Sequence, residues 1–170
     1  MARLHLIIGP VGAGKSTFAL ALSREHRAVR LTLDEWMATL FGADERPASG
    51  RIAWYVERTD RCLEQMWRLA VRMVDLGTDV VLEIGLIQRA AREAFYRRVD
   101  DAGLGLTVHV VDAPREVRRA RVMARNVEKG ETFSMEVPPE FFELASNLWE
   151  PPDEAERAAR EMRFVGVKGG

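Results

Sequence analysis

The sequence has a single cysteine, Cys62, among its 170 residues. An intrachain disulfide is therefore impossible, and because Cys62 lies in an apolar, helix-like stretch we expect a buried thiol, not a nucleophile. No apolar run reaches the roughly 20 residues that a membrane-spanning helix needs. The first residues also lack the charged, apolar and small-residue regions of a signal peptide. These absences predict a cytoplasmic protein that does not associate with membranes.

Neither sign of charge dominates, because 25 basic residues face 26 acidic ones and the net charge is −1. This balance gives no overall attraction to nucleic acid or anionic membranes, although it leaves room for a local basic patch. Histidine is also scarce, and no pair of the three histidines has the sequence spacing of metal ligands. We expect His5 and His109 to be packing residues in strands and His26 to be a surface residue that follows a helix.

Short apolar runs alternate with helical patterns along the chain. Apolar strands separated by helices are typical of an α/β fold in which helices cover both faces of a parallel sheet. No repeat or linker interrupts the pattern, so we predict one domain over residues 1–170. The predicted strands are Leu4–Ile8, Ala28–Leu33, Asp79–Ile84, Leu106–Val111 and Arg163–Val167, and the main helical patterns cover residues 15–24, 51–76 and 88–99 with further helices from 34 and 114.

Residues 9–16 read Gly-Pro-Val-Gly-Ala-Gly-Lys-Ser, which matches the motif G-x-x-x-x-G-K-[ST] in full. In such a loop backbone N–H groups converge on phosphate oxygens, and the N-terminus of the following helix adds its positive end. We expect Lys15 to reach the β and γ phosphates and the Ser16 hydroxyl to bind Mg²⁺. A chance match occurs about once in two hundred sequences of this length. The other residues predicted to bind nucleotide here are Gly9, Gly12, Ala13, Gly14 and Thr17.

The remaining motifs narrow the class of nucleotide-binding protein. The chain has no Asn/Thr-Lys-x-Asp tetrad, which GTPases use to recognise guanine. Motor and transport ATPases have larger domains and a hydrophobic run that ends in Asp-Glu, whereas the run at residues 80–83 ends in a lone glutamate, Glu83. A small kinase is therefore favoured.

These motifs resemble those of the small P-loop kinase family, AAA_33-like and zeta-toxin-like, that includes chloramphenicol phosphotransferase, zeta-toxin kinases and the 5′-kinase domain of polynucleotide kinase. The resemblance covers nearly the whole chain and rests on Gly9–Thr17, Leu33–Asp34 and Val117–Asn126. It implies a three-layer α/β/α sandwich of nucleoside-kinase type with a mostly parallel five-stranded sheet and a helical lid around residues 115–140. It also implies ATP as donor and transfer of the γ-phosphoryl group to an acceptor hydroxyl.

Asp34 follows the second predicted strand, at the end where ligands of open parallel sheets bind. In the kinases that the chain resembles, an aspartate here contacts the acceptor hydroxyl and accepts its proton, so we predict a catalytic and substrate-binding role for Asp34. The alternative is that Thr32 or Asp34 only caps the helix that follows. Trp36 is a candidate for the acceptor pocket because it adjoins Asp34, although aromatic residues at helical spacing are more often core residues.

Glu83 ends the third predicted strand, which the resemblance places close to the first. Its carboxylate could bind a magnesium-bound water or the acceptor, and the alternative is a structural carboxylate at a strand end.

Two of the arginines in the helix from Pro114, Arg121 and Arg125, are four residues apart and therefore share a face. The resemblance implies that they enter the lid and stabilise the charge of the transferring phosphoryl group. Asn126 is predicted to lie near the adenine, and residues 128–139 are predicted to form a mobile flap. The other three arginines are expected to be solvated or paired with Glu116 and Glu128; they are Arg115, Arg118 and Arg119.

Three functions fit this pattern. The first is a magnesium- and ATP-dependent kinase for a small molecule such as an antibiotic, nucleoside or sugar. The second is a polynucleotide 5′-kinase, which needs a basic tract near Asp34, whereas residues 35–45 are neutral to acidic. The third is a non-catalytic nucleotide-binding switch. The identity of the acceptor and the oligomeric state stay open.

Overall fold

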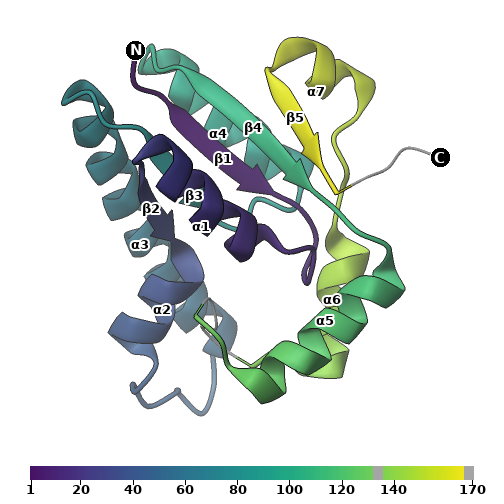
Figure 1. Cartoon of the computed structure of the whole chain (residues 1–170). Coiled ribbons are helices and arrows are strands. Elements are labelled where there is room, and N and C mark those ends of the chain that lie inside the picture. The colour runs from purple at the N-terminus through teal and green to yellow at the C-terminus, as the bar shows by residue number, and fades with distance from the viewer. Residues whose placement is uncertain (132–135, 167–170) are drawn as a thin grey trace.

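The computed structural model describes residues 1–131 and 136–166 (Figure 1). Strands and helices alternate through most of this part of the chain, as the apolar runs predict. The strands are β1 (Leu4–Ile8), β2 (Val29–Thr32), β3 (Val80–Glu83), β4 (Leu106–Val111) and β5 (Met162–Val165). The helices are α1 (Lys15–His26), α2 (Leu33–Phe41), α3 (Arg51–Asp75), α4 (Arg89–Asp101), α5 (Arg115–Glu128), α6 (Pro139–Leu148) and α7 (Glu154–Ala159).

The five strands form one sheet in the order β2-β3-β1-β4-β5, and every pair in it is parallel. The predicted five-stranded α/β fold is thus confirmed. Strand β1 lies in the centre, between β3 and β4, so the loop after β1 is next to the end of β3. Because parallel strands end at one edge, the glycine-rich loop, Glu83 and the start of α2 meet there.

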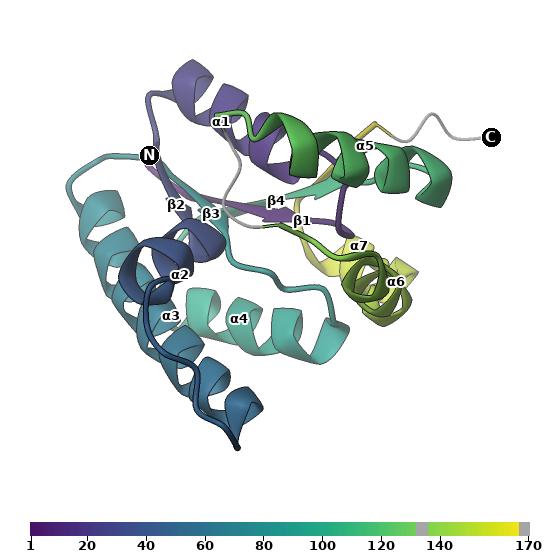
Figure 2. The same ribbon diagram turned by 90° about the horizontal axis from the view of Figure 1, so that it is seen from below.

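Helices cover both faces of the sheet, and Figure 2 shows α1 and α5 on one side with α3 and α4 on the other. The alternation of side chains along β1 explains this arrangement. Leu4, Leu6 and Ile8 face the main core with residues of α3 and α4, whereas Ile7 packs with Ala19 of α1 in a second apolar cluster. Both faces of the central strand are buried, which is why its sequence is continuously apolar.

Element ends differ slightly from the sequence predictions. Strand β2 ends at Thr32 and α2 already begins at Leu33, so Asp34 lies inside the first helical turn. The last strand is Met162–Val165, whereas Val167 of the predicted strand lies outside the described residues. The predicted flap ends where α6 begins, at Pro139, and its residues 132–135 also lie outside the described part of the chain.

A buried ion pair holds the C-terminal part of the chain to α4. Arg92 is fully buried and donates two hydrogen bonds to Glu156, from Nε at 2.7 Å and from Nη2 at 2.9 Å. The Tyr96 hydroxyl donates a third hydrogen bond to Glu156, at 2.8 Å, and Arg92 also donates to the carbonyl oxygen of Ile87, at 3.1 Å. The charges of this pair are therefore compensated inside the protein.

We predict that Arg92→Met lowers the free energy of unfolding by about 3–5 kcal/mol, because it leaves the carboxylate of Glu156 buried without its cation. Urea denaturation followed by circular dichroism measures the change. Arg68→Met is the matched control, since Arg68 pairs with Glu64 on the exposed side of α3 and such pairs contribute about 1 kcal/mol or less. Equal losses in the two variants would contradict the assigned role of the buried pair.

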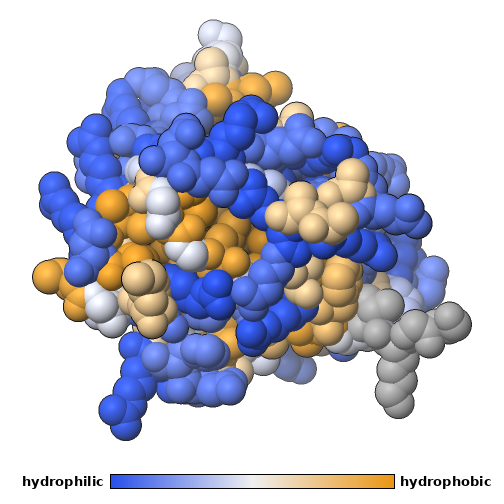
Figure 3. Space-filling model, turned by 90° about the horizontal axis from the view of Figure 1, so that it is seen from above, coloured by the Kyte–Doolittle hydropathy of each residue, from blue (hydrophilic) through white to orange (hydrophobic). Residues whose placement is uncertain are grey.

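Figure 3 looks onto the end of the molecule where the strands begin, and it shows hydrophilic side chains around a hydrophobic area. The glycine-rich loop lies at the opposite end, where the strands finish (Figure 1). Among the described residues no helix is both long and apolar enough to cross a membrane.

Candidate active site

The loop between β1 and α1 requires glycine at two positions. Gly9 has φ 152°, and a Cβ atom there would lie 1.9 Å from the carbonyl oxygen of Val111. Gly12 has φ 77°, and its Cβ would lie 2.6 Å from the carbonyl oxygen of Arg118. The lack of room for a Cβ atom and the positive φ angles therefore both exclude residues other than glycine at these positions. Gly14, also at positive φ, is the N-cap of α1, so the positive end of that helix is directed at the loop.

Lys15 is held across the loop that precedes it. Its Nζ donates a hydrogen bond of 2.8 Å to the carbonyl oxygen of Pro10. Burial lowers the pKa of the Lys15 amine, and the carboxylates of Glu83 and Asp34 act in the opposite direction. The ammonium group is thus partly desolvated, and an anionic ligand in the cleft would compensate its charge.

Ser16 and Glu83 join the loop to the end of β3. The Ser16 hydroxyl donates a hydrogen bond of 2.5 Å to Oε1 of Glu83, whose side chain is 8% exposed. Oε2 of Glu83 has no hydrogen-bond partner among the described residues, and the nearest cation is Nη1 of Arg30 at 3.8 Å. Burial raises the pKa of Glu83, while the Ser16 bond and Lys15 oppose this shift.

This pair of oxygen ligands fits a small hard cation, because Mg²⁺ is bound through hydroxyl, carboxylate and water oxygens. The unpartnered Oε2 atom is the observation that points to a missing cation, because leaving a buried carboxylate oxygen without a hydrogen-bond donor costs free energy. Ser16 was the predicted magnesium ligand, and Glu83 lies next to it.

A cleft of about 580 Å³ lies over the loop and reaches from α2 and α3 to α5 and α6. Residues from every motif singled out in the sequence contribute to its lining, so segments far apart in the chain form one cavity. The predicted site residues that line it are Gly12, Gly14, Lys15, Ser16, Thr17, Asp34, Glu83, Arg121 and Arg125.

Asp34 lies on the wall of this cleft that α2 forms. It follows Thr32 by two residues, and Thr32 pairs with Glu83 across the sheet. The side chain of Thr32, the N-cap of α2, makes no capping hydrogen bond, and Asp34 lies within the helix. Burial and the charge of Asp34 raise the pKa of the Tyr55 hydroxyl, which also lines the cleft. Asp34 therefore lines the cavity, and its catalytic role stays a prediction.

Two arginines of α5 form the opposite wall. Arg121 donates a hydrogen bond of 3.2 Å from Nη1 to the carbonyl oxygen of Ala13, so α5 already contacts the glycine-rich loop. Arg125 lines the same cleft one turn later, and its buried Nε has no hydrogen-bond partner among the described residues. The two side chains share a face, as their spacing predicts.

Comparison with known proteins agrees with this geometry. The model of the AAA_33 family, described as an AAA domain, matches residues 4–148. The chain belongs to this family. The sequence-based resemblance to small P-loop kinases is thereby confirmed at the level of family and fold. No curated protein matches the chain by sequence.

Solved structures share the fold of this AAA_33 protein at low sequence identity. An unliganded sugar kinase from Janibacter sp. HTCC2649 has a TM-score of 0.63 at 17% identity, with 97% of this chain and 85% of the other covered. Kti12 from Chaetomium thermophilum in complex with ADP-AlF3 has a TM-score of 0.63 at 16% identity, with 97% and 89% covered.

A chain of the Pnkp1/Rnl/Hen1 RNA repair complex has a TM-score of 0.63 at 21% identity, and the match covers 86% of this chain but 43% of that one. All three similarities establish the fold alone, and the P-loop fold implies that a nucleotide binds at the glycine-rich loop.

Arg118 of the AAA_33 chain corrects one sequence expectation. It was expected to be solvated, but it is 6% exposed. Its Nη1 donates to the carbonyl oxygen of Val11 at 2.9 Å and to the Ser146 hydroxyl at 3.0 Å, so it fixes α5 and α6 to the phosphate loop. Its spacing of three from Arg121 and four from buried Val122 placed it on the inner face, a signal that the sequence analysis missed.

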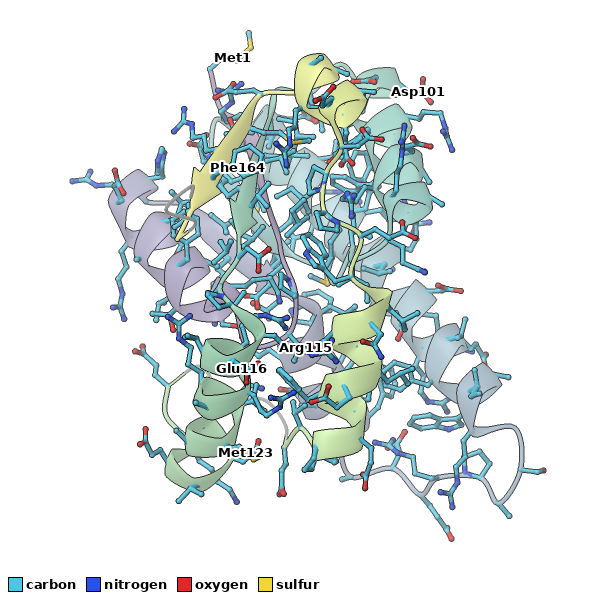
Figure 4. The ribbon with its side chains drawn as sticks, turned by 90° about the vertical axis from the view of Figure 1, so that its right-hand side faces the viewer. Met1, Asp101, Arg115, Glu116, Met123 and Phe164 are labelled. Carbon is cyan, nitrogen blue, oxygen red and sulfur yellow. The ribbon has the colours of Figure 1, made fainter. Side chains whose placement is uncertain are left out.

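Arg115 and Arg119 pair with α6 instead of the expected Glu128. Figure 4 shows Arg115 between the two helices, and both arginines contact the carboxylate of Glu143. The expected pairing of Arg119 with Glu116 is present, at 3.1 Å. The pairs with Glu143 join α5, which lies in the predicted lid, to α6, which begins at the end of the lid.

The remaining predicted residues lie away from the cleft lining. The side-chain amide of Asn126 makes two hydrogen bonds with the backbone of Val137, with Nδ2 donating at 2.9 Å and Oδ1 accepting at 3.1 Å. Asn126 therefore holds Val137 of the predicted flap to α5. Its predicted contact with adenine stays a prediction. Trp36 packs against the main core, and Tyr55 of α3 is the aromatic residue that lines the cleft near Asp34.

Proposed function

We propose that this protein is a magnesium- and ATP-dependent kinase that transfers the γ-phosphoryl group to a hydroxyl of a small molecule. One observation carries the proposal: the phosphate loop, the carboxylate of Asp34 and the arginines of α5 line a single cleft. Phosphoryl transfer requires a held donor, an oriented acceptor and compensation of negative charge, and these three residue groups supply them. We further propose that residues 1–170 act as one cytoplasmic domain with a lid around residues 115–140.

On the donor side, the loop amides and Lys15 would hold the phosphates of ATP. Ser16 and Glu83 would hold magnesium, directly or through its water. When bound, magnesium supplies positive charge to the phosphate oxygens. Lys15 would exchange the carbonyl oxygen of Pro10 for a phosphate oxygen, a partner that compensates its buried charge better.

On the acceptor side, Asp34 would accept a hydrogen bond from the acceptor hydroxyl and take its proton as the new bond from the acceptor oxygen to the γ-phosphorus forms. The bond between the γ-phosphorus and the β–γ bridging oxygen breaks in the same transfer, and ADP leaves. Tyr55, Ile87 and Phe141 also line the cleft, and their apolar surfaces would exclude water near the acceptor. Exclusion of water matters because water is the competing acceptor in every kinase site.

The acceptor class is argued from the size and lining of the cleft. A volume of about 580 Å³ lies within the range of roughly 300–1,000 Å³ that is typical of small-molecule sites. The similarity of fold to a sugar kinase is consistent with a polyhydroxylated acceptor of this size, and the ADP-AlF3 bound by Kti12 is consistent with ATP as donor.

A polynucleotide 5′-hydroxyl is the second candidate, because the chain also shares its fold with part of an RNA repair complex. The cations that line the cleft, however, are Lys15, Arg121 and Arg125, which the proposed mechanism assigns to the phosphates of the donor. Phosphate backbones are bound mainly by lysine and arginine, with strong dependence on salt. A single-stranded nucleic acid acceptor is therefore less well supported.

The proposal is tested with a panel of sugars, nucleosides, antibiotics and 5′-hydroxyl oligonucleotides incubated with ATP and Mg²⁺, with phosphorylated products identified by mass spectrometry. We expect a phosphorylated small molecule that is absent without the protein or without Mg²⁺. Phosphorylation of oligonucleotides alone would support the second candidate. Nucleotide binding with no product across the panel would favour the alternative of a non-catalytic switch.

We predict that Lys15→Met weakens ATP binding by roughly 10–100-fold, which corresponds to the loss of a charge-assisted hydrogen bond of about 1.5–3 kcal/mol. Isothermal titration calorimetry measures the dissociation constant. Arg24→Met is a suitable control, because Arg24 lies on the exposed side of the same helix, α1, and pairs there with Glu131 from another segment of the chain. Unchanged affinity in the Lys15 variant would contradict the assigned phosphate contact.

A further inference from the structure

All three histidines of the chain lie together, at the end of the molecule opposite the cleft. His26 is the last residue of α1, His5 is near the start of β1, and His109 is on the neighbouring strand β4. Asp79, the residue before β3, completes the group. Four segments that are far apart in the sequence thus bring imidazole and carboxylate groups to one point.

The spacing of these groups matches the ligand set of a tetrahedral metal ion. Nε2 of His5 lies 3.3 Å from Oδ2 of Asp79, and Nδ1 of His26 lies 3.5 Å from the same oxygen. One ligand atom from each of the three residues lies within 4.8 Å of the others. Metal–ligand bonds of about 2.1 Å at tetrahedral angles place ligand atoms about 3.4 Å apart, so two of the three edges already have the required length.

His109 provides outer support for this group. Its Nε2 lies 3.1 Å from Nδ1 of His5, so the ring nitrogen of His5 that faces away from Asp79 is hydrogen-bonded. Metal-binding histidines are oriented in this way by a partner on the second nitrogen. Nδ1 of His109 is buried without a hydrogen-bond partner among the described residues, so this ring can change tautomer with its neighbour without breaking another bond.

The site is accessible, and the backbone around it favours positive charge. The side chains of His26 and Asp79 are 30% and 23% exposed, which gives an ion a path from solvent, whereas His5 is 2% exposed and fixed. His26 ends a helix of 12 residues, whose C-terminus carries partial negative charge.

We propose that His5, His26 and Asp79 bind a divalent transition-metal ion of the zinc class, with His109 as the supporting residue. Two imidazoles and one carboxylate favour Zn²⁺ over Mg²⁺, which takes mainly oxygen ligands. The ion joins the end of α1 to the start of β1 and β3, on the face of the sheet away from α3 and α4. It is separate from the magnesium site proposed at Ser16 and Glu83, and it does not depend on the kinase assignment.

The test uses the full chain without a histidine tag, stripped with chelator and titrated with Zn²⁺ in the absence of nucleotide, against a chromophoric competitor. We expect one equivalent to bind, and we expect Co²⁺ to give the visible absorption of a tetrahedral complex. Mutation of a residue that supports a metal ligand lowers metal affinity by roughly 10–100-fold, and loss of a ligand itself lowers the affinity further. His26→Gln and Asp79→Asn are therefore expected to weaken binding more than about 100-fold, and His109→Gln about 10–100-fold.

Two controls locate the ion. Glu25→Gln removes the exposed carboxylate next to His26 in the sequence. Glu83→Gln removes the carboxylate at the proposed magnesium site in the cleft. Neither change is expected to alter the affinity for Zn²⁺. Nitrogen NMR shifts of the His5 and His26 rings are expected to move on titration even if His109→Gln fails to fold. Zinc binding that survives both His26→Gln and Asp79→Asn, that is lost in Glu83→Gln, or that is absent in the unmodified chain overturns the proposal.

Discussion

Replacement of Arg121 and Arg125 together by methionine is expected to lower the rate of phosphoryl transfer by about 10³–10⁵-fold, the range found for arginines that contact a transferring phosphoryl group. Arg121 already contacts the phosphate loop at Ala13, and Arg125 has a buried Nε without a partner among the described residues. Both guanidinium groups are thus placed to compensate charge that develops on the phosphate. Methionine keeps much of the aliphatic side chain, so packing against the cleft is retained.

The rate is measured at saturating ATP and acceptor, so that weaker binding is not mistaken for slower transfer. Arg119→Met on the same helix is the control, because Arg119 pairs with Glu143 and Glu116 instead of lining the cleft. We expect at most a small loss in the control. If the double variant also keeps most of its activity, α5 does not act on the phosphoryl group.

The second large effect is expected at Asp34. Asp34→Asn removes the proton acceptor with almost no change in shape, and loss of a general base typically slows transfer about 10²–10⁴-fold. Because the carboxylate lies on the acceptor wall of the cleft, the rate constant for transfer falls while the affinity for ATP changes little. Rapid-quench measurement of a single turnover separates these two quantities.

Glu35→Gln is the matched control for Asp34. Glu35 is the next residue of α2 and pairs with Arg30 at 3.1 Å on an exposed surface. Both changes remove one acidic group from the first turn of the same helix, so a general loss of helix stability affects both variants alike. Near-normal turnover in folded Asp34→Asn protein would show that Asp34 only positions the acceptor or has no role.

The donor half of the site could be predicted because its signals are local. Glycines, Lys15 and Ser16 are contiguous, and an apolar strand and a helix flank them, so eight residues specify one backbone shape. The place of Asp34 also followed from local pattern, since strand ends of a parallel sheet share one edge. The parallel sheet in turn followed from apolar strands separated by helices.

The parts that escaped prediction depend on contacts between distant segments. Arg118 binds the carbonyl oxygen of Val11 across 107 positions of sequence, and its helix has so many arginines that charge alone does not identify the buried one. The histidines are another case, because His5 and His109 come together only through the pairing of β1 with β4. Sequence spacing carries no information about such pairs.

The most direct test of the central claim follows the γ-phosphoryl group itself. ATP labelled with ¹⁸O on the terminal γ-phosphoryl oxygens is incubated with the protein, Mg²⁺ and the acceptor found in the panel, and the product is weighed by mass spectrometry. The proposed kinase transfers all of these labelled oxygens to the acceptor, whose own hydroxyl oxygen becomes the unlabelled bridge to phosphorus. Label found only in inorganic phosphate, or remaining entirely in ATP, would contradict a phosphotransferase site in this cleft.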